Sequence, residues 1–235
     1  NGLSFGASDV NVFIGVGGPD WTRPLSEQDD LVGFGLQNVD VGLGVFKAQL
    51  TGIQTQNFFS LSLHADEIGT YGFGDILTLR ATDVTVEVNT GGKLFNVLRS
   101  TADYRSVKTT DADGNEQIGY AIRTGGDPVT LTFAGPELIG LDIGLAEIAI
   151  ADFLFLRGSL AFRKGEIYDI TMDTGGLAPL LESVGVTDGQ IPLQVTAMTI
   201  GGANLSGFAG VGGPYRFGED ADGDGLLDQI NEGAV

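Results

Sequence analysis

The chain has 235 residues, of which 31 are acidic and 12 are basic, so its formal net charge is −19. Nucleic acid and anionic lipid surfaces are bound by clustered lysine and arginine side chains, so neither is an expected partner. Hydrophobic residues make up 42% of the chain and charged residues 18%, a composition that supports a folded core. Cysteine is absent, which excludes disulfides, and His64 is the only histidine, which excludes a histidine-rich metal site.

Neither a membrane span nor a secretory leader is predicted from the sequence. No apolar run reaches the roughly 18 residues that cross a bilayer. The first ten residues, NGLSFGASDV, lack the basic and apolar regions of a signal peptide. We therefore expect the chain to be part of a longer protein.

Strand-like patterns run through most of the chain, because apolar and polar residues alternate and Val, Ile, Thr and Phe are abundant. The alternating stretches are 39–50, 58–65, 77–88, 128–133, 141–162 and 193–200. Several exceed the roughly five or six residues of an average strand. We therefore expect long antiparallel strands, arranged as an elongated sandwich, a roll or a solenoid. Only residues 177–185, LAPLLESVG, predict a short helix, so the predicted fold class is all-β.

The two ends of the chain carry the same sequence motif. Residues 3–19, LSFGASDVNVFIGVGGP, align without gaps on residues 198–214, MTIGGANLSGFAGVGGP, with an offset of 195. Seven of the 17 positions are identical, and Asp9 corresponds to Asn204. The simplest interpretation is a unit of about 195 residues that recurs in a longer protein. Residues 1–197 then form one β-rich unit, and residues 198–235 begin the next.

An acidic loop, DADGDGLLD, follows the second copy of the motif. Carboxylates at loop positions 1, 3, 5 and 9 and a glycine at position 6 are typical of a calcium site, in which position 7 contributes its backbone carbonyl. Position 12 falls on an asparagine, and a carboxylate follows one residue later. The predicted calcium ligands are Asp220, Asp222, Asp224, Leu226, Asp228, Asn231 and Glu232. A solvated acidic linker is the alternative.

The acidic loop resembles the DxDxDGxxD calcium repeats of thrombospondin type 3 and dockerin-like modules. The wider chain is acidic, glycine-rich, free of cysteine and repetitive, and it resembles tandem modules of very large secreted, calcium-dependent bacterial surface and adhesin-type proteins. The two FxGVGGP segments, at residues 13–19 and 208–214, carry most of this resemblance. It implies a place at the cell surface and a role in adhesion or in scaffold or filament assembly. The implied partners are neighbouring copies of the repeat and surface glycans, with Ca²⁺ at the junctions.

Two smaller motifs have a structural interpretation beside a functional one. Asp111, Asp113 and Asn115 form either a second calcium loop or a hairpin turn, and the strand-like runs on both sides favour the hairpin. Asp173 begins an Asp-Thr-Gly sequence like that of aspartic proteases. However, Thr-Gly-Gly also follows strand-like runs at residues 90–92 and 124–126, so a turn that ends a strand explains it better.

His64 lies near Ser60, Ser62, Asp66 and Glu67, a set that contains a nucleophile, a base and an orienting acid. A polar strand face toward solvent predicts the same residues, and no GxSxG nucleophile motif accompanies them.

The sequence therefore predicts a non-enzymatic structural module. A carbohydrate- or lipid-binding β module is the alternative, and a hydrolase is the third hypothesis. The aromatic residues that could stack on sugars are Trp21, Tyr71, Phe73, Tyr104, Tyr120, Tyr168 and Tyr215.

Overall fold

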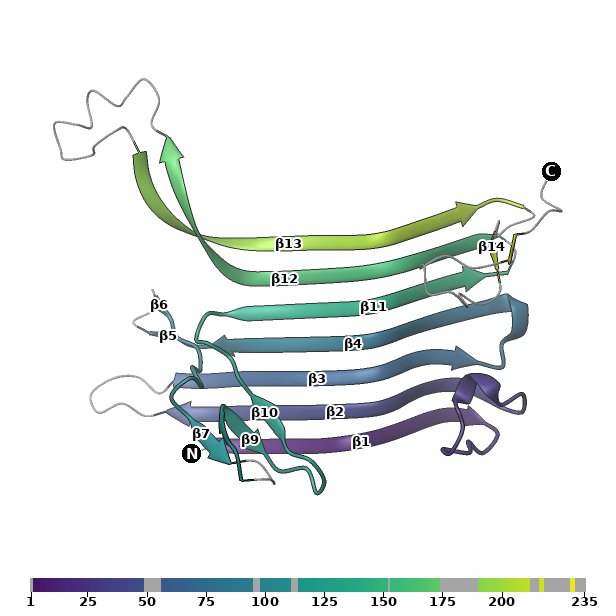
Figure 1. Cartoon of the computed structure of the whole chain (residues 1–235), viewed down its shortest axis with the longest axis horizontal. Helices are drawn as coiled ribbons and strands as arrows, with labels where there is room; N and C mark the ends of the chain where they lie inside the picture. Colours follow the sequence, from purple (N-terminus) through teal and green to yellow (C-terminus); the bar gives the residue numbers. More distant parts are fainter. Residues whose placement is uncertain are drawn as a thin grey trace.

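The chain folds around one open, seven-stranded antiparallel sheet (Figure 1). The computed structural model describes residues 2–48, 56–94, 98–110, 114–151, 153–173, 190–211, 216–217 and 229–230. The strand order is β1-β2-β3-β4-β11-β12-β13. The all-β class and the long antiparallel strands predicted from the sequence are confirmed, and the long strands of the described residues form a single layer.

The strands of the sheet are 13 to 20 residues long. They are β1 (Gly2–Val16), β2 (Val32–Ala48), β3 (Gln56–Tyr71), β4 (Leu77–Gly91), β11 (Leu138–Ile150), β12 (Leu154–Asp173) and β13 (Gln190–Ala209). Two short 3₁₀ turns, η1 (Leu25–Glu27) and η2 (Gly74–Ile76), lie in the connections. The short strands are β5 (Lys93–Leu94), β6 (Leu98–Arg99), β7 (Lys108–Thr110), β8 (Glu116–Ile118), β9 (Tyr120–Ile122), β10 (Val129–Leu131), β14 (Arg216–Phe217) and β15 (Gln229–Ile230).

The alternating run at 141–162 is two strands instead of one. The chain reverses after Ile150, and Leu154 pairs back on it. Ala151 at the reversal has a φ of 42°, in the left-handed region that glycine usually occupies. Residues 150–153 contain no glycine, proline or asparagine, and Asp152 is the single turn-favouring residue among them, so the turn signal in the sequence is weak there. The predicted helix at 177–185 lies outside the described residues.

Between β4 and β11, residues 102–110 and 114–137 fold back over one face of the sheet at β1 to β4 (Figure 1). The buried side chains of this cover are Tyr104, Ile122, Leu131 and Phe133. They pack against Phe46 of β2, whose ring lies edge-on to Tyr120 at a centroid distance of 5.2 Å. The strands beneath the cover need small residues at the points of contact. Gly42 of β2 is an example, since a Cβ at this position would lie only 2.7 Å from Val129 Cγ1.

The hairpin predicted around residues 111–115 is present within this cover. β7 pairs with β8, and Thr110 lies opposite Glu116. Gly114 has a φ of 87°, as a tight turn with left-handed residues requires. Asp111 and Asp113 lie outside the described residues, so the alternative of a second calcium loop is untested.

A second, smaller cover is the connection between β1 and β2. Leu25 and Leu31 of this connection are buried together with Tyr71 of β3, and Phe13 of β1 packs against them. A Cβ on Gly35 would lie 2.6 Å from Leu25 Cδ1, so β2 has no room for a side chain at this position.

Both covers lie on the same face. Leu63 and Ile68 of β3 pack in one apolar cluster with Val39, Ala65 and Val84. Ser60 and Tyr71, which contact the two covers, are each three residues from a member of that cluster, so they point to the opposite face. We call this the covered face, and the face that carries Val39, Ala65 and Val84 the open face.

Candidate functional site

The predicted calcium loop cannot be located in the structure. Its seven predicted ligands, from Asp220 to Glu232, lie outside the residues whose side chains the structure describes. Within the described ranges, no group of three or more histidine and acidic side chains is arranged to hold a metal ion. Several described residues with unusual backbone conformations lie in the middle of the sheet, and the recurring motif lies at its two edges.

A row of irregular residues crosses the sheet at mid-length, and we call it the seam. The register shifts there between β1 and β2, between β11 and β12, and between β12 and β13. The non-glycine residues of the seam with a positive φ have values of 50° to 54° and are all aspartate or asparagine, the non-glycine residues that tolerate this conformation best. The seam consists of Asp9, Asn38, Asp66, Asp83, Gly144, Gly158 and Asn204.

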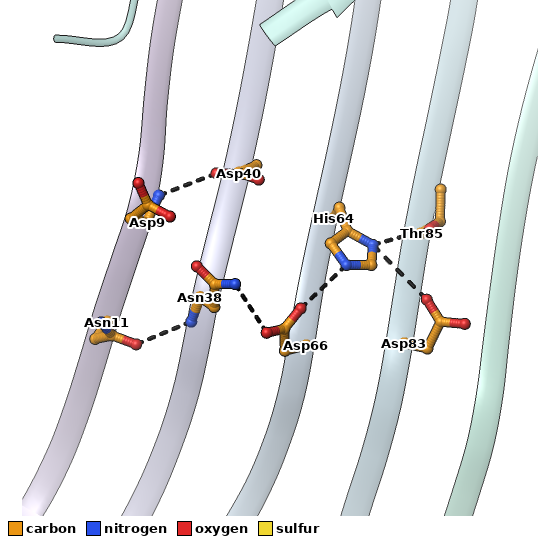
Figure 2. Close-up of polar contacts among 8 residues, drawn as sticks. All are labelled: Asp9, Asn11, Asn38, Asp40, His64, Asp66, Asp83 and Thr85. Atoms are coloured by element: carbon orange, nitrogen blue, oxygen red, sulfur yellow. Dashed lines mark hydrogen bonds and ion pairs between the residues drawn. The ribbon is translucent and has the colours of Figure 1, made fainter. Parts of the chain in front are cut away.

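Polar side chains bind the backbone where the ladder is interrupted (Figure 2). The Asp9 amide donates to Asp40 Oδ1 at 3.0 Å, and the Asn38 amide donates to Asn11 Oδ1 at 2.9 Å. The Asn38 side-chain amide also donates to Asp66 Oδ2 at 2.8 Å. A bulge removes ladder partners from the backbone, and these side chains replace them. The seam is therefore a structural device that bends the strands in step.

His64 belongs to the same polar row. Its Nε2 lies 3.2 Å from Asp66 Oδ1, and its Nδ1 lies 3.3 Å from Thr85 Oγ1 and 3.9 Å from Asp83 Oδ1 (Figure 2). The histidine thus connects β3 to β4 on the covered face.

Ser60, the nucleophile considered with His64, takes part in a different network. It is buried beneath the cover, where its Oγ donates to Asn89 Oδ1 and accepts from the Tyr104 hydroxyl, both at 2.9 Å. The structure therefore brings His64 and Asp66 together but uses Ser60 as a core hydrogen-bonding group.

The other motifs are placed as follows. Asp173 is the last residue of β12, and the Thr-Gly that follows it lies outside the described residues. At residues 124–126, Thr124 Oγ1 accepts from the Gly126 amide at 3.1 Å and donates to the Asp127 carbonyl at 2.8 Å, which confirms a turn.

The candidate sugar-stacking aromatics do not form one exposed row. Tyr71 of β3 is buried beneath the smaller cover, Tyr104 is buried in the larger one, and Tyr120 packs beside Tyr104. Tyr215 lies outside the described residues, whereas Trp21, Phe73 and Tyr168 are exposed. Of these three, Trp21 follows the end of β1, and Tyr168 lies on β12 toward the opposite end of the sheet.

The two edges of the sheet are the two strands that carry the repeated motif. Among the described strands, β1 and β13 each have a sheet neighbour on one side only (Figure 1). Asp9 and Asn204, which correspond in the alignment, have φ values of 54° and 52°. The sequence recurrence is therefore also a recurrence of backbone conformation.

The paired residues across the sheet show how the two copies are related. The row that starts at Ala7 of β1 ends at Ile200 of β13, which corresponds to Phe5. The row passes through Val41, Leu63, Val86, Leu141 and Phe162. The second copy of the motif, on β13, is therefore displaced by two residues along the strand direction relative to the first copy on β1. An even shift keeps corresponding residues on the same face, and six antiparallel steps keep β13 in the direction of β1.

Gly6 and Gly201 correspond in sequence but differ in surroundings. A Cβ on Gly6 would lie 2.7 Å from Ile122 Cγ2 and 2.9 Å from the Arg123 carbonyl, both in the cover. A Cβ on Gly201 would meet no described atom within 4 Å. Glycine is required by packing at the first position, whereas the described structure shows no such requirement at the second.

Two neighbouring rows of the open face are apolar from edge to edge. All residues in the row from Ala7 to Ile200 are apolar, and so are those in the next row, which runs from Val10 to Gly202. Several large side chains of this face are exposed, including Phe5 at 56%, Leu160 at 43% and Ile200 at 75%.

The charged side chains in the middle of the sheet gather on the covered face instead. Arg163 pairs with Asp142 at 2.8 Å and with Glu87 at 3.2 Å, and Arg80 pairs with Glu67 at 2.8 Å. These contacts join neighbouring strands across the covered face, whereas Lys164, opposite Ile139 and Met198, is a charged residue of the open face.

Comparisons with known proteins identify no relative. The sequence matches no protein-family model, and searches of curated proteins and of solved structures give no significant match. Within the described part of the chain, no helix has the length and apolar character that a bilayer crossing requires.

Proposed function

We propose that this chain is a structural, non-enzymatic repeat module of a large bacterial surface protein or filament, in which neighbouring copies of the unit join side by side. The observation that carries the proposal is the placement of the recurring motif. Its two copies form opposite edges of one sheet, and Asp9 and Asn204 share the same left-handed conformation. A module with the same motif at both edges of its sheet is suited to an array. The edge strand of one unit can then make the same contacts with the next unit that the first strand makes within its own unit.

The proposed array is extracellular and calcium-stabilised, and it acts in adhesion or scaffold assembly. The sequence resemblance supports the location. Four aspartates within nine residues, from Asp220 to Asp228, support the cation, since they repel one another unless a cation lies among them.

The side-by-side proposal is tested by comparing one unit with two. One chain contains residues 1–235, and the other contains residues 1–195 followed directly by residues 1–235. We expect a higher melting temperature for the two-unit chain, because joined units bury edges that a single unit exposes. Equal melting temperatures would identify independent domains and refute the structural role.

Calcium is tested on the full chain with a matched pair of variants. A ligand that binds only the folded state stabilises it by about 2.7 kcal/mol at a hundredfold excess over its Kd. We expect calcium to raise the melting temperature relative to chelator, and Asp222→Asn with Asp224→Asn to abolish this response. The control, Asp111→Asn with Asp113→Asn in the segment between β7 and β8, should keep this response. The proposed site would be contradicted if calcium still raised the melting temperature of the Asp222→Asn, Asp224→Asn variant, or if it did not raise that of the unchanged chain.

A further inference from the structure

We infer that successive units share one continuous β-sheet, in which β13 of one unit is also the first strand of the next. This inference rests on the proposed function and specifies how the units join. The outer edge of β1 then pairs with the β12 of the preceding unit, and the outer edge of β13 pairs with the β2 of the following unit. The repeating element of the sheet is six strands.

The direction of β13 and the face to which its side chains point both allow the sheet to continue into the next unit. β13 runs in the direction of β1, because every neighbouring pair in the sheet is antiparallel. The two-residue stagger between Ala7 and Ile200 is even, so corresponding side chains stay on the same face. An odd stagger would have turned the apolar residues of every second unit to the covered face.

The glycine pair supports the same arrangement. Gly6 is glycine because Ile122 and Arg123 of the cover press on it. Gly201 has no described neighbour that requires glycine. In a continuous sheet the cover of the following unit lies over Gly201 as this unit's cover lies over Gly6, which accounts for glycine at both positions.

The seam also continues through the junction. The Asp9 amide donates to Asp40 Oδ1 on β2. Asn204 has the same backbone conformation, and its amide is expected to donate to the equivalent of Asp40 in the following unit.

The continuous sheet has a definite period. Six strand spacings of about 4.8 Å place equivalent points about 29 Å apart across the strands. The two-residue stagger moves each unit about 7 Å along the strand direction. An array of three or more units is therefore expected to show a repeat near 30 Å in electron micrographs or fibre diffraction.

Cysteine cross-linking in the two-unit chain tests the register, against a background that contains no native cysteine. Phe162 lies opposite Ile200, the counterpart of Phe5. We therefore expect Phe162→Cys in the first copy to form a disulfide with Phe5→Cys in the second copy. Leu160→Cys with Ala7→Cys is a second in-register pair. Phe162→Cys with Ile14→Cys, which is out of register, is the control.

The outcomes separate this inference from the proposed function. Cross-linking of the two in-register pairs alone supports the continuous sheet. If the two-unit chain is more stable than one unit but only the control pair or no pair cross-links, the units join by another surface. The inference then fails while the structural role stands. If the two-unit chain has no added stability and no cross-link, both fail.

The open face carries a second inference, from a different observation. We infer that this face packs against the open face of a second copy of the unit, giving two stacked sheets. An apolar sheet face is stable when another layer buries it, and no described segment covers this one. Seven strands of about 13 residues give a face of roughly 34 Å by 44 Å. Two such faces bury about 3,000 Å² in total, within the range of permanent interfaces.

The charge and shape of the open face indicate which partner covers it. The open face has two apolar rows that extend across all seven strands, so two copies match each other along these rows. The exposed Lys164 lies in the neighbouring row, opposite Ile139 and Met198. A net charge of −19 disfavours an anionic lipid surface.

Sedimentation of the full chain, with a matched pair of variants on β12, tests the stacking. Leu160 and Ala161 are adjacent and exposed, and they point to the open and the covered face respectively. We expect the parent chain to be a dimer whose population increases with salt. Leu160→Lys should make it a monomer, and Ala161→Lys should leave it a dimer. A parent chain that is monomeric at all concentrations would overturn the inference, and its binding to phosphatidylcholine vesicles would assign the face to lipid.

Discussion

The contrast between Gly6 and Gly201 gives a sharp prediction about packing. In Gly6→Ala the new methyl group would lie 2.7 Å from Ile122 Cγ2 and 2.9 Å from the Arg123 carbonyl. Overpacking of this kind costs about 1–3 kcal/mol. The lower conformational entropy of alanine in the unfolded chain offsets roughly 0.5–1 kcal/mol of that cost. We therefore expect Gly6→Ala to lower the free energy of unfolding by about 1–2 kcal/mol.

The matched variant Gly201→Ala keeps the entropic gain without the clash, because a Cβ there meets no described atom within 4 Å. We expect it to be neutral or to stabilise the single chain by up to about 0.5 kcal/mol. Urea unfolding followed by circular dichroism measures both variants. At roughly 2–4 °C per kcal/mol for a chain of this size, the two melting temperatures should differ by several degrees.

Equal losses at the two glycines, or a neutral Gly6→Ala, would refute this reasoning. In the two-unit chain the glycine shared by the two copies lies under a cover and should respond like Gly6. A neutral substitution there would show that the cover of the second unit does not pack as it does in the first.

Three further predictions concern the covers and the seam. Burial and the 2.6 Å hydrogen bond to Glu67 raise the pKa of Tyr71, so its contribution to stability is complete below pH 10 and falls as the pH rises above it. Tyr71→Phe should cost about 1–2 kcal/mol at pH 7 and flatten the pH dependence of unfolding above pH 10. Asp9→Val should cost about 1–3 kcal/mol because φ is 54° there, whereas Asp9→Asn should be nearly neutral in the same urea titration. Ser60→Ala should cost about 1–3 kcal/mol, since it leaves the buried hydroxyl of Tyr104 without its acceptor, and an unchanged unfolding midpoint would contradict that network.

The local pattern of the sequence was sufficient to predict the kind of structure. Alternation of apolar and polar residues is a property of neighbouring positions, so the all-β class and the strands at 58–65 and 77–88 were predicted correctly, as was the run at 39–50 as far as residue 48, where the described part of it ends. The hairpin between β7 and β8 was predicted for the same reason, because a turn depends on a few adjacent residues. The recurrence of residues 3–19 at 198–214 is likewise a property of the amino-acid sequence alone.

Tertiary structure alone decided how the strands are assembled. Pairing of β4 with β11 spans residues 92–137, which include the cover, and its register depends on contacts far apart in the chain. The reversal at Ala151 has Asp152 as its single turn-favouring residue, a weak local signal, so packing of β12 on β11 selects it.

The meaning of the recurrence also required the sheet. Asp9 and Asn204 are ordinary polar residues in the sequence, and nothing local marks them as left-handed bulges. Their place in a seam depends on the bulges of the neighbouring strands, because one irregular strand must be matched by the next for the ladder to resume. The sequence alone shows that the motif at residues 3–19 recurs at residues 198–214. Pairing across seven strands is what turns these two ends into opposite edges of one sheet, in the same direction and on the same face.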